Sequence, residues 1–396
     1  MLLEQALELI VDTAPVNDVE DVDLDSCWGR VCSGNNPAVL PVPCYDQSTR
    51  DGYVIRAGHQ RSNTGDPVFG IRGEIPAGPT GDMRIEPGEA YRIMTGGLVP
   101  ELADRVIPQE RCRVAGDKVI IDRHLLLAPN RFIRRRGSDI AAGDQLVEAG
   151  TRLNEVHAAR FASSGNRSLK VYRKPRVAFV CSGSELVIGG DFLQPGQKFS
   201  SNHYLLKFLI MRHGGIAIDY GLVEDNTDAV ESTLKSIIAS DADMIISTGG
   251  VGPGKYDLFC DILPGLGAQI LYRSLQVRPG RSTLFAAIGN KLYFGLPGPP
   301  SAVHILFHEC ICPALRKMQG CRTWFSRRTN CFLSHDISLK KADVLCFREG
   351  CCSAAAGGFE VRFADRNQIP NCFVLLEPGV KSYKRGDPIA VSMLDP

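Results

Sequence analysis

Val177-Ala-Phe-Val-Cys-Ser-Gly-Ser184 and Asp243-Met-Ile-Ile-Ser-Thr-Gly-Gly250 are the stretches that decide the fold of this 396-residue chain. Each is a short apolar run that ends in small polar residues and glycine, which is typical of a buried strand followed by a turn. Between them, helical spacing of apolar residues over 202–213 and 227–239 flanks a strand pattern at 216–220. Strands alternating with helices of this length predict βαβ units and a mostly parallel sheet.

The sequence on either side of this region has a different texture. An amphipathic helix is expected over 2–12, whereas 31–150 is rich in Gly and Pro with short apolar runs, which predicts β structure. A helix is expected over 300–318, and short strands predominate after Thr323. The chain is therefore predicted to be a multi-domain α/β protein, with a central mostly parallel α/β domain, β-rich domains and a small C-terminal β domain.

Composition excludes several classes of protein. The chain has 45 Lys and Arg against 44 Asp and Glu, a formal net charge of +1, so no global field attracts nucleic acid or an anionic membrane. Leu2–Val11 carries Glu4 and Glu8 and lacks the basic flank of a signal peptide, and no later stretch reaches the ~18 uninterrupted apolar residues of a membrane span. We expect a soluble, cytoplasmic protein without nucleic-acid or membrane partners.

The 14 cysteines give no recognisable ligand spacing. No Cys-x-x-Cys pair is present, and neither Cys310-Ile-Cys312 nor Cys351-Cys352 fits a usual zinc motif. His308-Glu309-Cys310 could be drawn as a metal site, but it lies in an apolar helical pattern and nothing else in the sequence converges on it. Free and mostly buried thiols are therefore expected.

Two candidate anion sites follow predicted parallel strands, at 182–185 and 247–257. Glycines in these turns allow the backbone to approach an anion closely. The second turn contains Gly249-x-x-x-x-Gly254-Lys255, but Tyr256 follows where a P-loop has the Ser or Thr that holds magnesium. Phosphate binding and a plain strand-to-helix turn both remain open, whereas a P-loop ATPase is disfavoured.

Two further segments carry charge in clusters. Four arginines gather within 131–136, which suits an anion site or a solvated surface. Asp46 and Asp51 flank a turn, where two carboxylates could bind a metal or cap the turn. No Ser/His/Asp triad signature is present.

Taken in order, these segments resemble one family, the molybdopterin molybdenumtransferases, which include MoeA and the gephyrin E-domain. The resemblance covers roughly residues 2 to 320. It is carried by Gly29-Arg-Val31, Asp46-x-Ser48-x-x-Asp51-Gly-Tyr53, Arg92-Ile-Met-Thr95-Gly-Gly-x-x-Pro100, Ile133-Arg-Arg-Arg-Gly-Ser-Asp139, Ser182-Gly-Ser-Glu185-Leu, Asn202, Asp225, Ser247-Thr-Gly-Gly250 with Asp257, Arg278-Pro-Gly280 and Gly295-Leu-Pro-Gly298.

This resemblance implies an activity and an architecture. Family members take adenylylated molybdopterin and molybdate, release AMP with Mg²⁺ present, and place molybdenum on the dithiolene sulfurs of molybdopterin. They are homodimers, and a molybdopterin adenylyltransferase is a further expected partner. The expected division is an N-terminal helix packing with the α/β domain (1–26), a linking β-rich domain (27–43 and 140–174), a β-rich domain that contributes to the partner's site (44–139), a MogA-like α/β domain that binds molybdopterin (175–322) and a C-terminal β domain (323–396).

The resemblance also assigns residues. The implied site acids are Asp51, Asp139, Glu185, Asp225 and Asp257, of which Asp225 and Asp257 would hold or orient Mg²⁺. The implied substrate-binding residues are Thr95, Ser182, Gly183, Ser247, Thr248, Gly249, Gly250, Pro297 and Gly298, together with Arg278 and Arg281 where the family usually has lysines.

Several positions depart from the family pattern. Arg50 replaces a Met, Gly298-Pro299-Pro300 replaces Gly-Asn-Pro, and Lys255 reverses the charge of an Asp beside the implied Mg²⁺ site. Such changes leave a second hypothesis open, a non-catalytic paralogue that binds molybdopterin or a partner protein as a carrier or scaffold. The retained acids favour the enzyme.

Overall fold

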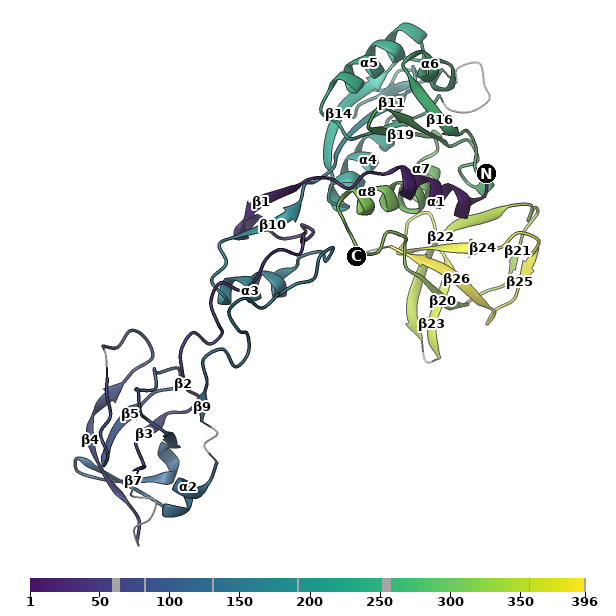
Figure 1. The fold of residues 1–396 in the computed structure, drawn as a ribbon. Helices are drawn as coiled ribbons and strands as arrows, with labels where there is room; N and C mark the ends of the chain where they lie inside the picture. The colour runs from purple at the N-terminus through teal and green to yellow at the C-terminus, as the bar shows by residue number, and fades with distance from the viewer. Residues whose placement is uncertain are drawn as a thin grey trace.

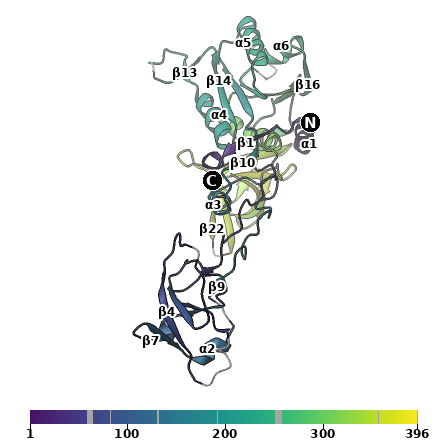
Figure 2. The same ribbon diagram turned by 60° about the vertical axis from the view of Figure 1, so that its left-hand side comes forward.

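The protein is described from a computed structural model that covers residues 1–58, 65–81, 83–129, 132–190, 192–250, 258–355 and 357–394. The molecule is elongated (Figures 1 and 2), with the α/β unit and the C-terminal β unit side by side at one end and a β-rich unit at the other. Two antiparallel strands and a short helix, β1, β10 and α3, lie between the two ends. No helix among the described residues combines the length and apolarity needed to cross a membrane.

The α/β unit is built on a six-stranded sheet in the order β14-β11-β15-β19-β18-β16. The first four strands are parallel, and β18 and β16 are antiparallel to their neighbours, so the expected mostly parallel sheet is confirmed. The strands are β11 (Arg176–Ser182), β14 (Ile216–Val223), β15 (Met244–Thr248), β16 (Ala268–Tyr272), β18 (Leu284–Ile288) and β19 (Lys291–Leu296).

Alternate side chains of β11 enter two separate cores, one on each face of the sheet. Val177, Phe179 and Cys181 pack with α1 (Leu3–Thr13), α4 (Ser201–Arg212) and the helix that begins at Pro300. Ala178 and Val180 pack instead with α5 (Thr227–Ala239) and α6 (Phe259–Gly265). A strand that is apolar throughout is buried on both faces, which explains why the run at 177–181 shows no polar alternation.

The helix expected over 300–318 is present but contains a π turn. It consists of α7 (Pro300–Leu306), the π segment η4 (Phe307–Ile311) and α8 (Cys312–Met318). The backbone N–H of Cys312 donates to the carbonyl of Phe307, five residues back. Pro313 follows directly, and because it has no N–H and its ring crowds the preceding turn, regular α-helical bonding fails there.

The C-terminal unit is a six-stranded sheet in the order β17-β22-β23-β20-β26-β24. Its edge strand β17 (Val277–Arg278) comes from the α/β segment and pairs in parallel with β22 (Leu345–Ala355). The remaining strands are β20 (Arg328–Leu333), β23 (Gly358–Phe363), β24 (Cys372–Leu376) and β26 (Pro388–Met393). The predicted β structure after Thr323 is thus confirmed, and the pairing of β17 with β22 joins the two units.

The middle and far end of the molecule are mostly β structure, as expected. In the middle, β1 (Val19–Asp23) pairs with β10 (Ser168–Tyr172) beside α3 (Glu155–Ser163). At the far end a sheet of order β6-β3-β5-β4-β8-β7 contains β3 (Gly52–Ile55), β4 (Val68–Ile75), β5 (Glu89–Ile93), β6 (Arg105–Pro108), β7 (Cys112–Ala115) and β8 (Lys118–Ile121). The domain boundaries assigned from the sequence stay predictions.

Glu309 is buried where the π turn meets the C-terminal sheet. Its Oε1 accepts a 2.6 Å hydrogen bond from Ser392 Oγ, and Arg328 lies 3.7 Å from its Oε2. Burial raises the pKa of the Glu309 carboxyl, against the lowering effect of these two partners. The folded state therefore holds this proton more tightly than the unfolded chain, and stability is lost as pH rises through the folded-state pKa.

We expect Glu309→Gln to raise the free energy of unfolding at pH 8 by about 1 kcal/mol, because the amide keeps the bond to Ser392 without a buried charge. The gain should shrink as pH falls, since the wild-type carboxyl then becomes neutral. Urea denaturation at pH 8 and pH 5 measures both values. Glu309→Ala leaves Ser392 and Arg328 without their carboxylate partner and should lower the free energy of unfolding at either pH. A Gln variant that is less stable than wild type at pH 8 would contradict this account.

Candidate functional site

A pocket of about 310 Å³ lies at the carboxyl edge of the parallel sheet. The parallel strands β11 and β15 end there, in the turns that begin at Ser182 and Thr248. The pocket is lined by Ser182, Glu185, Leu186, Lys198, Phe199, Ser200, Ser201, Asn202, Thr248, Gly249, Gly298, Pro299 and Pro300. Five of the site residues that the resemblance assigns are thus brought together: Ser182, Glu185, Thr248, Gly249 and Gly298.

Asp225 lies beyond the end of β14 and is bonded to the turn that follows β11. Ser182 Oγ donates to Asp225 Oδ1, and the backbone N–H of Ser184 donates to Oδ2 at 3.3 Å. In return, the backbone N–H of Asp225 donates to Ser184 Oγ at 3.2 Å. Since a carboxylate can accept about four hydrogen bonds, Asp225 retains lone pairs for a cation.

Glu185 forms an ion pair across the mouth of the pocket. Lys198 Nζ lies 2.8 Å from Glu185 Oε1, and this hydrogen bond lowers the pKa of the Glu185 carboxyl. The pair leaves a fixed carboxylate and a fixed ammonium group side by side. Lys198 was not singled out from the sequence, because an isolated lysine 13 positions beyond Glu185 belongs to no motif.

The turn after β15 depends on glycine. Gly249 and Gly250 have φ of +85° and +62°, and a Cβ at Gly249 would lie 2.5 Å from the carbonyl oxygen of Ser182. The backbone of Gly249 therefore approaches Ser182 too closely for a side chain to fit between the two strand-end turns. Asn202 Nδ2 donates to the carbonyl of Gly298 at 2.8 Å and fixes the opposite wall.

The remaining candidates of this region do not line the pocket. Ser247 is fully buried, and its Oγ lies 2.5 Å from the hydroxyl of Tyr293, so that side chain contributes to the core beneath the turn. Gly183, Gly250 and Pro297 adjoin lining residues in sequence without lining the pocket themselves. Asp257 and Lys255 lie outside the described residues.

A second pocket, of about 450 Å³, lies where α7 meets the C-terminal sheet. Arg278 and Arg348 both line it, together with Ser301, Cys346 and Glu349. Two carboxylates nearby are already paired, Asp343 with Arg278 at 3.3 Å and Glu349 with His304 Nδ1 at 2.9 Å. Pro300 lines the first pocket and Ser301 the second, so the two pockets adjoin the start of α7.

Arg348 was missed by sequence reasoning, because it lies 70 positions after Arg278 in a strand without a motif. It reaches Arg278 through the pairing of β17 with β22, in which Arg278 is opposite Cys346. Arg281 does not line this pocket. Its carbonyl accepts hydrogen bonds from the N–H groups of Leu275 and Thr283, which shapes the turn before β18.

The remaining acids assigned by the resemblance, Asp51 and Asp139, lie in the β-rich unit, at the opposite end of the molecule from the α/β unit that holds the strand-end pocket (Figure 1). Thr95 donates to Asp51 from its backbone N–H at 2.7 Å and from its hydroxyl at 2.8 Å, and these bonds lower the pKa of the Asp51 carboxyl. Asp139 is bonded to Arg134 and to Ser138 Oγ. One chain thus does not bring Asp51, Thr95 and Asp139 to Ser182 and Asp225.

The cluster of arginines over 131–136 is largely engaged within the chain. Arg134 pairs with Asp139, and Arg135 pairs with Asp46, whose Oδ1 also accepts the backbone N–H of Arg136 at 2.7 Å. Arg131 lies outside the described residues. Asp46 and Asp139 therefore neutralise part of the positive charge that suited an anion site or a solvated surface.

A doubly covered, mostly parallel sheet with a glycine-lined polar pocket at its carboxyl edge defines a class of α/β proteins that bind anionic, phosphorylated ligands. Residues 1–165 match the family model of the MoeA N-terminal region (domain I and II), and residues 178–317 match that of a probable molybdopterin binding domain.

Named relatives agree with these matches. The molybdopterin molybdenumtransferase of Nostoc sp. is 39% identical over 308 residues, which cover 76% of this chain and 70% of the relative. That of Haemophilus influenzae is 33% identical over 82% of this chain and 79% of its own length. The molybdopterin biosynthesis MoeA protein of Pyrococcus horikosii superposes with a TM-score of 0.83 and 25% identity, covering 99% of this chain and 98% of that one.

The chain belongs to the molybdopterin molybdenumtransferase family, which confirms the resemblance inferred from its motifs.

Gly249→Ala should lower the free energy of unfolding by at least about 1 kcal/mol, because a Cβ is strained at positive φ and would collide with Ser182. Gly298→Ala is the matched control, since a Cβ there meets nothing within 4 Å and the residue lines the same pocket. Thermal or urea unfolding of both variants provides the comparison. Equal losses in the two variants would mean that the contact between the turns is not a constraint.

Proposed function

We propose that this chain inserts molybdenum from molybdate into adenylylated molybdopterin, with Mg²⁺-dependent release of AMP. The observation that carries the proposal is the strand-end pocket at the carboxyl edge of the sheet, which Ser182, Thr248 and Gly249 line and where Ser182 Oγ donates to Asp225. In this reaction, water cleaves the phosphoanhydride bond, leaving molybdopterin, which keeps its own terminal phosphate, and AMP. Molybdate and the two dithiolene thiols then form two Mo–S bonds, with oxygen leaving as water.

The residues present fit a magnesium ion at Asp225. Mg²⁺ takes oxygen ligands and is commonly held by one or two carboxylates together with substrate phosphates and water. Asp225 supplies a half-buried carboxylate, oriented by Ser182 and by the N–H of Ser184. The ion would supply positive charge between the pyrophosphate oxygens. Asp257 remains the second proposed ligand.

We assign the molybdate to the second pocket. Arg278 and Arg348 present two guanidinium groups there, and planar forks of N–H donors bind the oxygens of a tetrahedral dianion. The two pockets adjoin the start of α7, so an oxyanion and a phosphorylated pterin could lie close enough to react. Arginine in place of the family's usual lysine at position 278 keeps the positive charge of this pocket.

A homodimer would complete the site. Asp51, Thr95 and Asp139 lie in the β-rich unit, at the opposite end of the molecule from Asp225. We propose that the β-rich unit of the partner subunit supplies these three residues to the site around Asp225. The β-rich unit projects away from the α/β unit (Figures 1 and 2), and in the proposed dimer it contacts the α/β unit of the second copy. A molybdopterin adenylyltransferase is the proposed source of the adenylylated substrate.

The competing function is a carrier or scaffold that binds the pterin without turnover. It is favoured by the pairing of Glu185 with Lys198, which leaves one proposed site acid already neutralised. Binding alone requires the pocket, whereas turnover also requires a cation between the phosphates. The two functions can therefore be distinguished by whether Asp225 is needed for AMP release.

Asp225→Asn should slow single-turnover release of AMP from adenylylated molybdopterin, with Mg²⁺ and molybdate present, by at least about 100-fold. The amide still accepts from Ser182 but loses the charge that holds the cation. Asp228→Asn, which removes an exposed charge three residues away in the first turn of α5, should leave the rate unchanged. Wild-type protein that binds the pterin but releases no AMP would establish the carrier instead.

Mixing Asp51→Ala chains with Asp225→Asn chains tests the shared site. Each mixed dimer would hold one site with both acids intact, so a random mixture should recover about a quarter of wild-type AMP release. Each variant alone should be nearly inactive. If mass measurements show mixed dimers but activity does not return, the site does not combine the two subunits in this way.

A further inference from the structure

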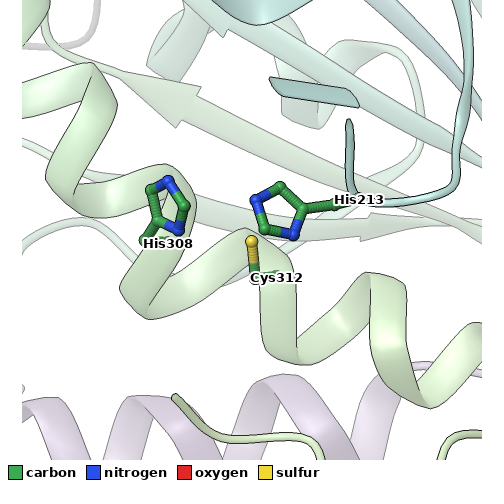
Figure 3. Close-up of side chains that lie close together, drawn as sticks. All are labelled: His213, His308 and Cys312. Atoms are coloured by element: carbon green, nitrogen blue, oxygen red, sulfur yellow. The ribbon is translucent and has the colours of Figure 1, made fainter. Parts of the chain in front are cut away.

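His213, His308 and Cys312 form a cluster of buried side chains away from both pockets (Figure 3). Their candidate ligand atoms all lie within 4.8 Å of one another. The two imidazole rings meet edge to face with centroids 4.9 Å apart, and the Cys312 sulfur lies beside them. The three side chains are 7%, 4% and 0% exposed.

Three features of the fold bring these side chains together. His213 is the C-cap of α4, and its carbonyl accepts a 2.8 Å hydrogen bond from Gln319 Nε2, just beyond α8. The π turn at Phe307–Ile311 carries His308, and Cys312 begins α8 directly after it. The sequence indicated only His308-Glu309-Cys310 as a possible grouping. In the structure Glu309 and Cys310 point elsewhere, to Ser392 and to Tyr272.

The ring of His308 lies between two other imidazoles, with His213 and His304 each meeting it edge to face. Within the described part of the chain, its buried Nε2 has no hydrogen-bond partner. Because buried polar atoms are nearly always bonded, an unsatisfied nitrogen beside a second imidazole and a thiol makes this cluster a candidate ligand site.

We propose that His213, His308 and Cys312 bind one soft d¹⁰ metal ion through two nitrogens and one sulfur. Bond lengths of about 2.0 Å to nitrogen and about 2.3 Å to sulfur require ligand atoms roughly 3.7 Å apart, which small side-chain rotations supply. The thiol proton is released when the metal–sulfur bond forms, so binding yields a neutral thiolate–copper(I) unit or a monocation with zinc.

Copper(I) fits this cluster better than zinc. Structural zinc takes four ligands, whereas the described residues offer three here, and copper(I) is satisfied by few, soft ligands. Arg212 and Arg316 place positive charge near His308, which penalises any further buried cation that its ligands do not neutralise. Copper(I) with one thiolate adds no net charge to the site, whereas zinc with one thiolate adds one positive charge.

An ion at this position would fix the end of α4 against the helix whose first turn borders both pockets. The role is structural, since none of the three ligands lines either pocket. Metal binding is measured without any reference to AMP release, so this inference can fail or hold independently of the proposed function.

The test uses the full chain, reduced and stripped of metal under anaerobic conditions. One arm adds copper(I) and the other zinc, each in competition with a chromogenic chelator, and the ion retained per chain is then counted by mass spectrometry. Wild type should retain one copper(I) ion, and X-ray absorption should report two nitrogens and one sulfur. Cys312→Ala should bind at least about 100-fold more weakly.

Cys310→Ala is the matched control, because that thiol is equally buried two residues away and points to Tyr272. It should retain the ion as wild type does. Retention of no ion by wild type, or equal retention by Cys312→Ala, overturns the site, and the X-ray measurement on wild type decides the case even if a variant fails to fold. Retention of zinc with rejection of copper(I) overturns the choice of ion.

Discussion

The parallel pairing of β11 with β14 and β15 is the constraint on which the site depends. Parallel strands end at the same edge, so the register that places Cys181 opposite Thr248 and Ser182 opposite Val223 also places the turns that follow in contact. Asp225 and Gly249 then reach Ser182 from two different strands. Were one strand reversed, these residues would lie at opposite edges of the sheet, and no change of side chain could restore the pocket.

A second pairing joins the units that supply the positive charge. The two residues of β17 leave the α/β segment and add a strand to the C-terminal sheet, beside β22. Arg278 and Arg348 therefore line a common pocket, although β17 comes from the α/β segment and β22 from the C-terminal segment of the chain. The buried Glu309, bonded to Ser392 of β26, crosses the same boundary from the helix side. Polar contacts thus fix the orientation of the two units, while their shared apolar core supplies the main driving force.

Local sequence was sufficient to predict a site residue where its position follows from the helix or strand that contains it. Ser182, Thr248 and Gly249 were predictable because they end apolar strands, and strand ends of a parallel sheet converge. Arg348 was not, since its position depends on a strand pairing between distant segments. The same holds for His213, which meets His308 and Cys312 only after the 94 residues between His213 and His308 have folded. Ser247 shows the opposite error, because alternation along β15 turns its side chain into the core toward Tyr293.

The helix from Pro300 to Met318 connects the two parts of this account. Its first turn borders both pockets. Its π turn inserts an extra residue just before Pro313, which interrupts regular α-helical hydrogen bonding. An extra residue rotates everything after it by about 100° around the helix axis. Side chains before the turn, such as Ser301 and Ile305, therefore face the arginine pocket, while Cys312 after it faces His213. A π turn is less stable than regular helix and often occurs at functional sites. Here it separates the half of the helix that borders the proposed oxyanion site from the half that begins with Cys312 of the proposed metal site.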